Sequence, residues 1–551
     1  MTAGNLAAGR RGEPNATCPC GSGRKYKICC GAAPSARSGA SSATHCYEEG
    51  NRQLGAGRID AAIQHYRRAI ILQPDFFQAY GNLGVALEQK GVLTEALDSY
   101  WAAVRHSGRR PEAAGAYLNY QKCLCRHQRE LFEMLRSDTE LPQEVLTRHL
   151  AFASQLETHS QPARRAHTNA RDPEKRLRIG YVSPDLRRHS VAYFIEPVIA
   201  RHDRNAVEVF CYHNCALSDA VTERIRRRAY HWLECPSMCD DNLAERIRAD
   251  GIDILIDLAG HTNGNRILTL AQKPAPVQIA YLGYPHPTGL ATMDYLLTDA
   301  LAHPGGITAA RRAERPLHLE PSMLVYQPAF GTNGLVADTG PAVAPAPLGR
   351  SGYVTFGCFN ARSKISDSLI GIWARVLTGV PGSRLLLKAH GLDEAGQRSA
   401  LLARFAQQGV GPECLVLEGR IEDPAAHLAR YGEVDIGLDT APYNGVTTSF
   451  EAMWMGVPFV TLAGRTLASR MGVSIATNVG HPEWIAATPQ EYVDKAVALA
   501  RDPQELSRLR RCLRMQLAAS ALMDAERFTR SLEAAYREVW RSWCAGKARR
   551  G

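Results

Sequence analysis

The chain has 551 residues, which at about 150 residues per domain indicates about three or four folded units. Hydrophobic residues make up 45% of it and charged residues 22%, and this composition excludes a wholly disordered, collagen-like or coiled-coil protein. Its 65 Lys and Arg against 55 Asp and Glu give a net charge of +10, which is spread along the chain. A dispersed excess of this size favours small anionic ligands at least as much as nucleic acid.

The start of the sequence carries no recognisable targeting signal. Residues 1–16 lack the apolar core of a secretion signal, and no run anywhere approaches the roughly 18 apolar residues of a membrane helix. We therefore expect a soluble, cytoplasmic protein with no membrane partner. Because the cytosol keeps thiols reduced, the 15 cysteines are not expected to form a disulfide framework.

Four cysteines lie close together in the sequence CPCGSGRKYKICCG. Thiolates at Cys18, Cys20, Cys29 and Cys30 can close a tetrahedron around zinc, since the glycines between the pairs allow a tight turn. The run also resembles the SEC-C motif, whose zinc knuckles are docking modules rather than catalysts. We expect residues 15–34 to form a structural zinc knuckle.

A helical repeat follows a small, polar stretch at 31–43, which we interpret as a flexible linker. The repeat has a 34-residue period that pairs Gly50 with Gly84 and Tyr66 with Tyr100. This spacing is typical of tetratricopeptide repeats, in which small residues lie where paired helices touch. We expect a tetratricopeptide region over 44–155, with the segment from Tyr117 to Leu135 as a candidate third repeat.

Short apolar runs alternating with helical patterns fill the rest of the chain, after an arginine-rich stretch at 160–176. Such runs predict parallel strands that are buried on both faces. They lie at 177–182, 207–212, 252–258, 277–283 and 293–299, and then at 353–357, 384–389, 414–419, 434–439 and 458–464. A Pro-, Ala- and Gly-rich break at 331–350 separates two α/β units, and we expect the ligand between the carboxyl ends of their strands.

A candidate anion site follows the run VDIGLD, in the sequence TAPYNGVTTSFEAMW. Asn444 and Gly445 are expected to form a turn, and Thr447 and Thr448 then stand at a helix N-terminus, where free amides and hydroxyls can hold a phosphate. No G-x-x-x-x-G-K-[ST] motif is present. Lys364, after the first strand of the same unit, can meet the same anion and stabilise charge on a leaving group.

Six sequence runs together resemble a known family. They are GYVSPDLRRHSVAYF, DLAGHTNGNR, KPAPVQIAYLGYPHPTG, CFNARSKI, DTAPYNGVTTSFEAMWMGVPFVTL and RTLASRMG. In this order, over about 177–540, they resemble the catalytic region of the O-linked N-acetylglucosamine transferases and their SPINDLY-type bacterial relatives. The resemblance implies a GT-B fold of two Rossmann-like domains, expected at 175–325 and 350–545, and inverting transfer from a UDP-sugar to Ser or Thr of acceptor proteins. It also implies that no metal lies at the catalytic centre. Acceptor proteins would bind to the repeats and to the zinc knuckle.

The resemblance assigns roles around the donor nucleotide. Lys364 matches the lysine that contacts the donor diphosphate, and Thr447 and Thr448 match its phosphate-binding threonines. His427 matches the histidine stacked against uracil, and Arg430 the arginine near the uracil edge.

Further roles follow from the same resemblance. Glu451 matches the acidic residue on the ribose, and Leu282 and Gly283 match the backbone of the sugar pocket. His189 matches an active-site histidine proposed as the base, although it can equally orient the substrates by hydrogen bonding. His261 is a second candidate for that position.

The sequence also departs from the family pattern. Ala361, Val446 and Tyr443 replace a glutamine, a histidine and a cysteine of the animal enzymes. The donor can therefore be UDP-N-acetylglucosamine, which we favour, another UDP-hexose, or GDP-fucose. Two other classes stay open: a non-catalytic adaptor that binds nucleotide, against which the retained Lys364 and His189 argue, and a nucleic-acid binder, which the dispersed charge makes the weakest reading.

Overall fold

The computed structural model describes residue 25 and residues 36–108, 113–304, 314–328 and 340–546. The four cysteines of the expected zinc knuckle lie outside these residues. The chain forms two compact units, Met1–His127 and Gln128–Gly551, which are considered one at a time.

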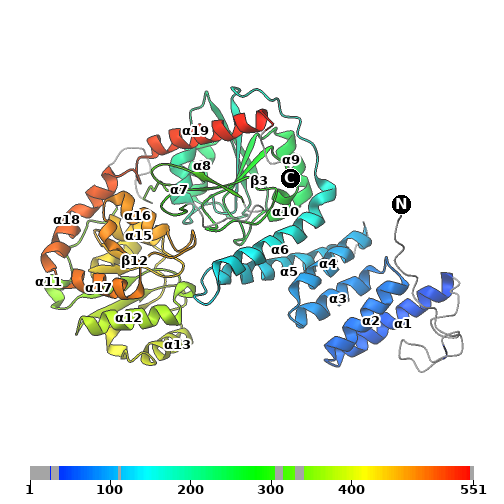
Figure 1. Cartoon of the computed structure of the whole chain (residues 1–551), viewed down its shortest axis with the longest axis horizontal. Helices are drawn as coiled ribbons and strands as arrows, with labels where there is room; N and C mark the ends of the chain where they lie inside the picture. Colours follow the sequence, from blue (N-terminus) through cyan, green and yellow to red (C-terminus); the bar gives the residue numbers. More distant parts are fainter. Residues whose placement is uncertain (1–24, 26–35, 109–112, 305–313, 329–339, 547–551) are drawn as a thin grey trace, which may run out of the picture. The chain divides into compact units, whose positions relative to one another are not determined.

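The first unit contains two helical hairpins (Figure 1), and the same contact holds each of them together. A side-chain carbon built on Gly50 would come within 2.6 Å of the ring of Tyr66, and one on Gly84 within 2.7 Å of the ring of Tyr100. Only glycine lets each helix approach its partner so closely, which confirms the 34-residue repeat. The helices are α1 (Ala36–Gly55), α2 (Ile59–Leu72), α3 (Phe77–Gln89) and α4 (Leu93–Ser107).

The structure differs from two expectations about this region, the linker and the third repeat. Residues 36–43 of the expected linker belong to α1. The candidate third repeat is a single helix, α5 (Ala113–Met134), which runs through the boundary between the two units. The next helix, α6 (Pro142–Ser160), contacts α10 and belongs to the second unit, so the expected end of the repeat region at 155 stays a prediction.

The second unit begins with a parallel sheet of seven strands within the described residues, in the order β3-β2-β1-β4-β5-β6-β7. Its strands are β1 (Leu177–Ser183), β2 (Val207–His213), β3 (His231–Glu234), β4 (Ile254–Asp257), β5 (Val277–Ala280), β6 (Tyr295–Thr298) and β7 (Arg315–His318). The helices between them are α7 (Ala192–Ile199), α8 (Ala220–Arg228), α9 (Asp240–Ala249) and α10 (Ile267–Ala271). The strand order reverses direction between β1 and β4, as in Rossmann-like domains.

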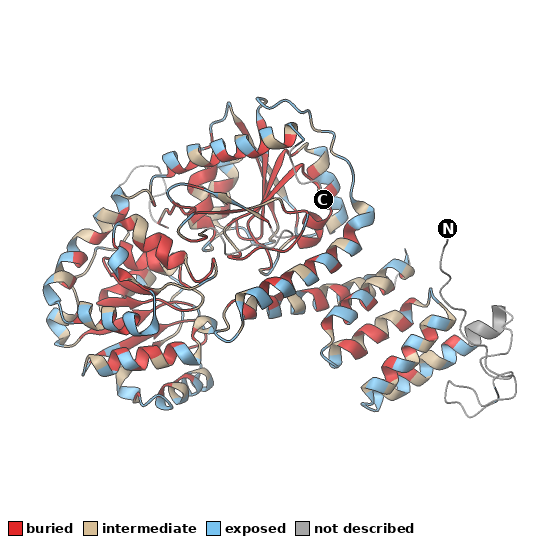
Figure 2. Ribbon diagram, viewed as in Figure 1, coloured by how far each residue is buried: buried red, intermediate tan, exposed pale blue. Residues whose placement is uncertain are grey.

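A second parallel sheet follows, with six strands in the described part of the chain and the order β10-β9-β8-β11-β12-β13. Its strands are β8 (Thr355–Cys358), β9 (Arg384–Lys388), β10 (Leu415–Glu418), β11 (Ile436–Leu438), β12 (Phe459–Leu462) and β13 (Ile485–Ala486). Its helices are α11 (Leu348–Ser351), α12 (Asp367–Gly379), α13 (Ala395–Ala406), α14 (Pro424–Ala429), α15 (Thr447–Trp454), α16 (Met471–Val479), α17 (Pro489–Ala500) and α18 (Pro503–Ala519). Central strands such as β8 are buried along their length, which agrees with their apolar sequences. Figure 2 shows buried residues, in red, along much of both sheets.

The last helix, α19 (Ala525–Cys544), returns to the first sheet and packs against α7 and β5 (the red helix in Figure 1). The hydroxyls of Tyr536 and Tyr181 lie 3.3 Å apart, and Glu533 is 2.8 Å from Nδ1 of His202. The apolar face of α19 therefore completes the core of the amino-terminal lobe.

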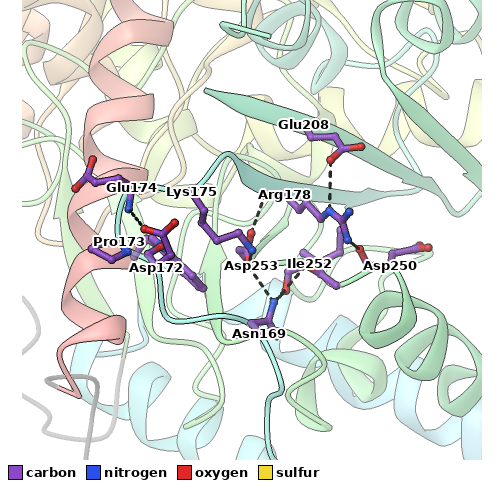
Figure 3. Close-up of polar contacts among 12 residues, drawn as sticks. Asn169, Asp172, Pro173, Glu174, Lys175, Arg178, Glu208, Asp250, Ile252 and Asp253 are labelled. Carbon is purple, nitrogen blue, oxygen red and sulfur yellow. Dashed lines mark hydrogen bonds and ion pairs between the residues drawn. The ribbon is translucent and has the colours of Figure 1, made fainter. Parts of the chain in front are cut away.

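A buried carboxylate fixes the extended segment that leads into β1 (Figure 3). Asp253 is 0% exposed, and its oxygens accept hydrogen bonds at 2.9 Å from Asn169, Lys175 and the amide of Arg178. Such a buried charge is tolerated because several donors satisfy it. The arginine-rich stretch before the sheet is thus held to the lobe rather than left free.

Among the described helices, none combines the length and the apolar character that crossing a membrane requires.

Candidate active site

A cavity of about 1030 Å³ lies where the two sheets bring their carboxyl ends together. Residues after β1, β5, β8 and β11 line it, and β1 and β8 flank the reversal points of their sheets. Eight of the predicted site residues belong to the lining: His189, Leu282, Gly283, Lys364, His427, Thr447, Thr448 and Glu451. Sequence segments that are far apart in the chain therefore converge on one cavity.

The carboxylate of Asp439, directly after β11, shapes the loop before α15. It accepts hydrogen bonds from the amide of Thr440 at 2.8 Å, the amide of Gly445 at 2.7 Å and the hydroxyl of Thr461 at 2.8 Å. Burial raises its pKa to about 6, although these donors and Lys364 favour the ionised form. The Asp439 carboxylate therefore fixes the turn at Gly445 by hydrogen bonds to its backbone.

The start of α15 faces the cavity. No side chain caps this helix, because its N-cap is the apolar Val446, and the first amides of a helix have no partner within it. The hydroxyl of Thr448 donates to Oδ1 of Asn360 at 2.8 Å. A side-chain carbon on Gly445 would come within 2.5 Å of the Thr448 hydroxyl, so this packing requires glycine. The arrangement can bind an anion through its amides and the helix dipole.

Lys364 lies in a short 3₁₀ turn after β8 and reaches the same loop. Its ammonium donates to the backbone oxygen of Asn444 at 2.8 Å and lies 4.2 Å from the centre of the Tyr443 ring. Burial lowers its pKa to about 8, Asp439 opposes the shift, and the charge of Arg136 adds to it. A buried cation beside an anion-binding helix end is suited to neutralise charge on a phosphate.

His427, on α14, lines the cavity. Its Nε2 lies 3.0 Å from Oε2 of Glu451, which the hydroxyl of Tyr431 also approaches at 3.4 Å. Arg430, by contrast, lies outside the lining, and its guanidinium donates to Glu418 at 2.8 Å. The predicted site residues His427 and Glu451 therefore meet at the cavity. Arg430 instead forms an ion pair with Glu418.

The opposite wall comes from the amino-terminal lobe. Nδ1 of His189 accepts a hydrogen bond from the amide of Val191 at 3.3 Å and lies 3.5 Å from Asp185. Burial lowers the pKa of His189, and Asp185 opposes the shift. Leu282 has a φ of 72°, a strained value for a non-glycine residue, and a side-chain carbon on Gly283 would lie 2.0 Å from a backbone oxygen.

Three other predicted residues support the cavity without lining it. His261 is buried, its Nε2 lies 2.9 Å from the backbone oxygen of Thr288, and its ring packs edge-on against Tyr284. Asn444 is buried and donates to Thr440 at 2.9 Å, while Gly445 forms the turn held by Asp439.

The sequence analysis did not single out Lys388 or Asp439. Both follow an apolar strand run, and a polar residue at the carboxyl end of a parallel strand was the available signal. Within the described residues there is no group of three His, Cys, Asp or Glu side chains that could hold a metal ion.

Two Rossmann-like lobes with a cavity at their facing strand ends define the GT-B architecture. Residues 139–321 and 350–532 match glycosyl transferase family 41, and the chain therefore belongs to that family. Residues 47–114 match a tetratricopeptide repeat, and residues 15–32 match the SEC-C motif.

Several known proteins are similar to the chain. One from Petunia hybrida, called "Probable UDP-N-acetylglucosamine--peptide N-acetylglucosaminyltransferase SPINDLY", is 41% identical over 69% of this chain and 40% of its own length. The UDP-N-acetylglucosamine--peptide N-acetylglucosaminyltransferase of Caenorhabditis elegans is 28% identical over 68% of this chain and 41% of its own. The chain thus spans about two fifths of the length of these relatives.

A solved structure covers more of the chain. A variant of the Thermobaculum terrenum O-GlcNAc transferase superposes with a TM-score of 0.71 and is 33% identical, over 93% of this chain and 99% of that one.

Proposed function

We propose that the protein transfers N-acetylglucosamine from UDP-N-acetylglucosamine to Ser or Thr hydroxyls of acceptor proteins, with inversion at the anomeric carbon. The observation that carries this is the convergence, in one cavity, of the buried Lys364, the uncapped start of α15 and the His427–Glu451 pair. Lys364 and the start of α15 are suited to bind a diphosphate, and the His427–Glu451 pair is suited to bind a nucleoside. The names of the relatives agree with this donor and with protein acceptors.

In the proposed reaction the acceptor oxygen attacks the anomeric carbon, and the bond from that carbon to the diphosphate breaks. Lys364, Thr447 and the amides at the start of α15 stabilise the charge on the departing diphosphate. The hydroxyl proton leaves to water or to the diphosphate, because UDP is a good leaving group. We assign no metal to this step.

His189 has an orienting role in this proposal. The amide of Val191 lies 3.3 Å from Nδ1, and a carboxylate oxygen of Asp185 lies 3.5 Å from the same nitrogen, so Nδ1 is engaged within the lobe. The other ring nitrogen, Nε2, can form a hydrogen bond with a substrate oxygen. We therefore place His189 as a residue that positions donor and acceptor by hydrogen bonding.

A donor comparison tests the function. The purified chain, incubated with a bacterial lysate as acceptor, is expected to release UDP from UDP-N-acetylglucosamine and to add N-acetylhexosamine to Ser or Thr of lysate proteins. Nucleotide release and intact-protein mass measure the two products. Faster release of GDP from GDP-fucose would overturn the donor, and no release from any sugar nucleotide would favour the adaptor.

We further propose that Cys18, Cys20, Cys29 and Cys30 bind one structural zinc ion, in keeping with the SEC-C match. The tetratricopeptide repeats, and with them this knuckle, would dock acceptor proteins. Replacing Cys18 or Cys29 by Ser is expected to remove about one zinc per chain and leave nucleotide release unchanged, because metal binding stabilises only the short segment that it folds. Elemental analysis beside the release assay measures both, and a zinc content unchanged in both variants would contradict the assignment.

A further inference from the structure

Lys388 is a buried lysine in the cavity wall that the proposed reaction does not use. It is the last residue of β9, lines the cavity and is only 4% exposed. Within the described residues its ammonium forms no ion pair. The nearby carboxylates have other partners, since Glu418 pairs with Arg430 and Glu451 with His427. A buried cation of this kind is costly unless it finds acceptors for its protons.

The ammonium of Lys388 lies at the edge of the His427 ring. Its Nζ is within hydrogen-bond distance of Nδ1 of His427, and the other ring nitrogen lies 3.0 Å from Glu451. Because an ammonium can only donate, Nδ1 is the acceptor, and the ring proton sits on Nε2 and points at the carboxylate. The two neighbours thus fix both the tautomer and the orientation of the imidazole, and the ammonium keeps two protons for other acceptors.

An aromatic ring and the imidazole surround this ammonium. Nζ lies 4.6 Å from the centre of the Phe359 ring, and the Phe359 and His427 rings are 6.2 Å apart. Burial lowers the pKa of Lys388 to about 8, although Glu451 and Glu418 favour its charged form. A base stacked on the imidazole would place its own edge above the ring edge where the ammonium lies.

We propose that Lys388 reads the hydrogen-bonding edge of the nucleobase, donating to a carbonyl oxygen such as O4 of uracil and rejecting the amino group that cytosine carries at the same position. The inference rests on the proposed function, because it assumes a nucleotide donor in this cavity. It makes Lys388 a specificity-determining residue in addition to the stacking His427.

UDP and CDP provide the test, because they share ribose and diphosphate and differ in the edge of the base. By calorimetric titration the wild-type protein is expected to bind UDP at least about tenfold more tightly than CDP, which corresponds to about 1.4 kcal/mol. In Lys388→Met, which keeps an unbranched side chain without the ammonium, the ratio is expected to fall below about threefold, since the charged hydrogen bond is lost. Lys495→Met, on α17, is the matched control and should keep the wild-type ratio.

The outcomes separate the two proposals. An unchanged UDP-to-CDP ratio in Lys388→Met, even with weaker binding of both, would overturn the role of Lys388, because it would mean that the ammonium acts on the shared ribose or diphosphate. A wild-type protein that binds neither nucleotide would overturn the proposed function itself. If Lys388→Met does not fold, 4-thio-UDP replaces it: sulfur accepts hydrogen bonds poorly, so the wild type should bind it several-fold more weakly than UDP, and equal affinity would contradict the inference.

Discussion

Lys364→Met is expected to lower turnover with UDP-N-acetylglucosamine by about 10² to 10³-fold, the usual effect of removing one group that stabilises developing charge. The ammonium already donates to the backbone oxygen of Asn444, beside the start of α15 where the diphosphate is expected. Burial lowers its pKa to about 8 by disfavouring the charged form, and a negative charge beside it would favour that form again. Methionine fills the same space but carries no positive charge to neutralise the departing diphosphate.

The effect should fall on kcat more than on KM, since the charge on the leaving group grows in the transition state. Steady-state UDP release with the wild type, Lys364→Met and the surface variant Lys495→Met separates the two parameters. Turnover of Lys364→Met within about twofold of the wild type would remove Lys364 from the proposed mechanism.

Asp439→Ala is expected to lower the free energy of unfolding by at least about 3 kcal/mol, because it leaves three buried donors without an acceptor and each such loss costs about 1 kcal/mol or more. Those donors are the amides of Thr440 and Gly445 and the hydroxyl of Thr461. Since the amide of Gly445 fixes the turn before α15, UDP binding should be lost as well. Denaturant unfolding and UDP titration measure the two effects.

Asp439→Asn is the matched variant. Its amide oxygen can still accept from both backbone amides, and the hydroxyl of Thr461 can turn to accept from the new NH₂ group. Asparagine should therefore retain most of the stability that alanine loses. Equal stability of Asp439→Ala and the wild type would mean that the loop keeps its shape without this carboxylate.

The central strands were predictable from sequence, and of the four edge strands in the described residues only β10 was. Each expected apolar run coincides with a strand, and most of these strands are buried along their length. The strands β3, β7 and β13 lie at sheet edges, and were missed. In β7 the residues alternate between exposed and half-buried, so the sequence RPLH carries no continuous apolar signal.

Some residues of the candidate site could be predicted from the sequence and others could not. The residues at strand ends and at the start of α15 were predictable, because a parallel sheet places its carboxyl ends at one edge and motif spacing fixes the order. The ion pair between Arg430 and Glu418 could not be predicted from sequence, because it depends on how α14 packs against β10. The ammonium of Lys388 was missed because a lysine at the end of an apolar run also reads as an exposed strand terminus.

The return of α19 to the first sheet bears on how the protein is made. A ribosome that has released residues up to 328 has delivered the whole of the seven-stranded sheet, but not the helix that contributes Tyr536 and Trp540 to its core. The contacts of Trp540 with the backbone of Asp172 and of Glu533 with His202 join segments at opposite ends of the second unit. The amino-terminal lobe is therefore synthesised first, but its core is completed only after the carboxyl-terminal lobe has been synthesised, because α19 follows that lobe in the chain.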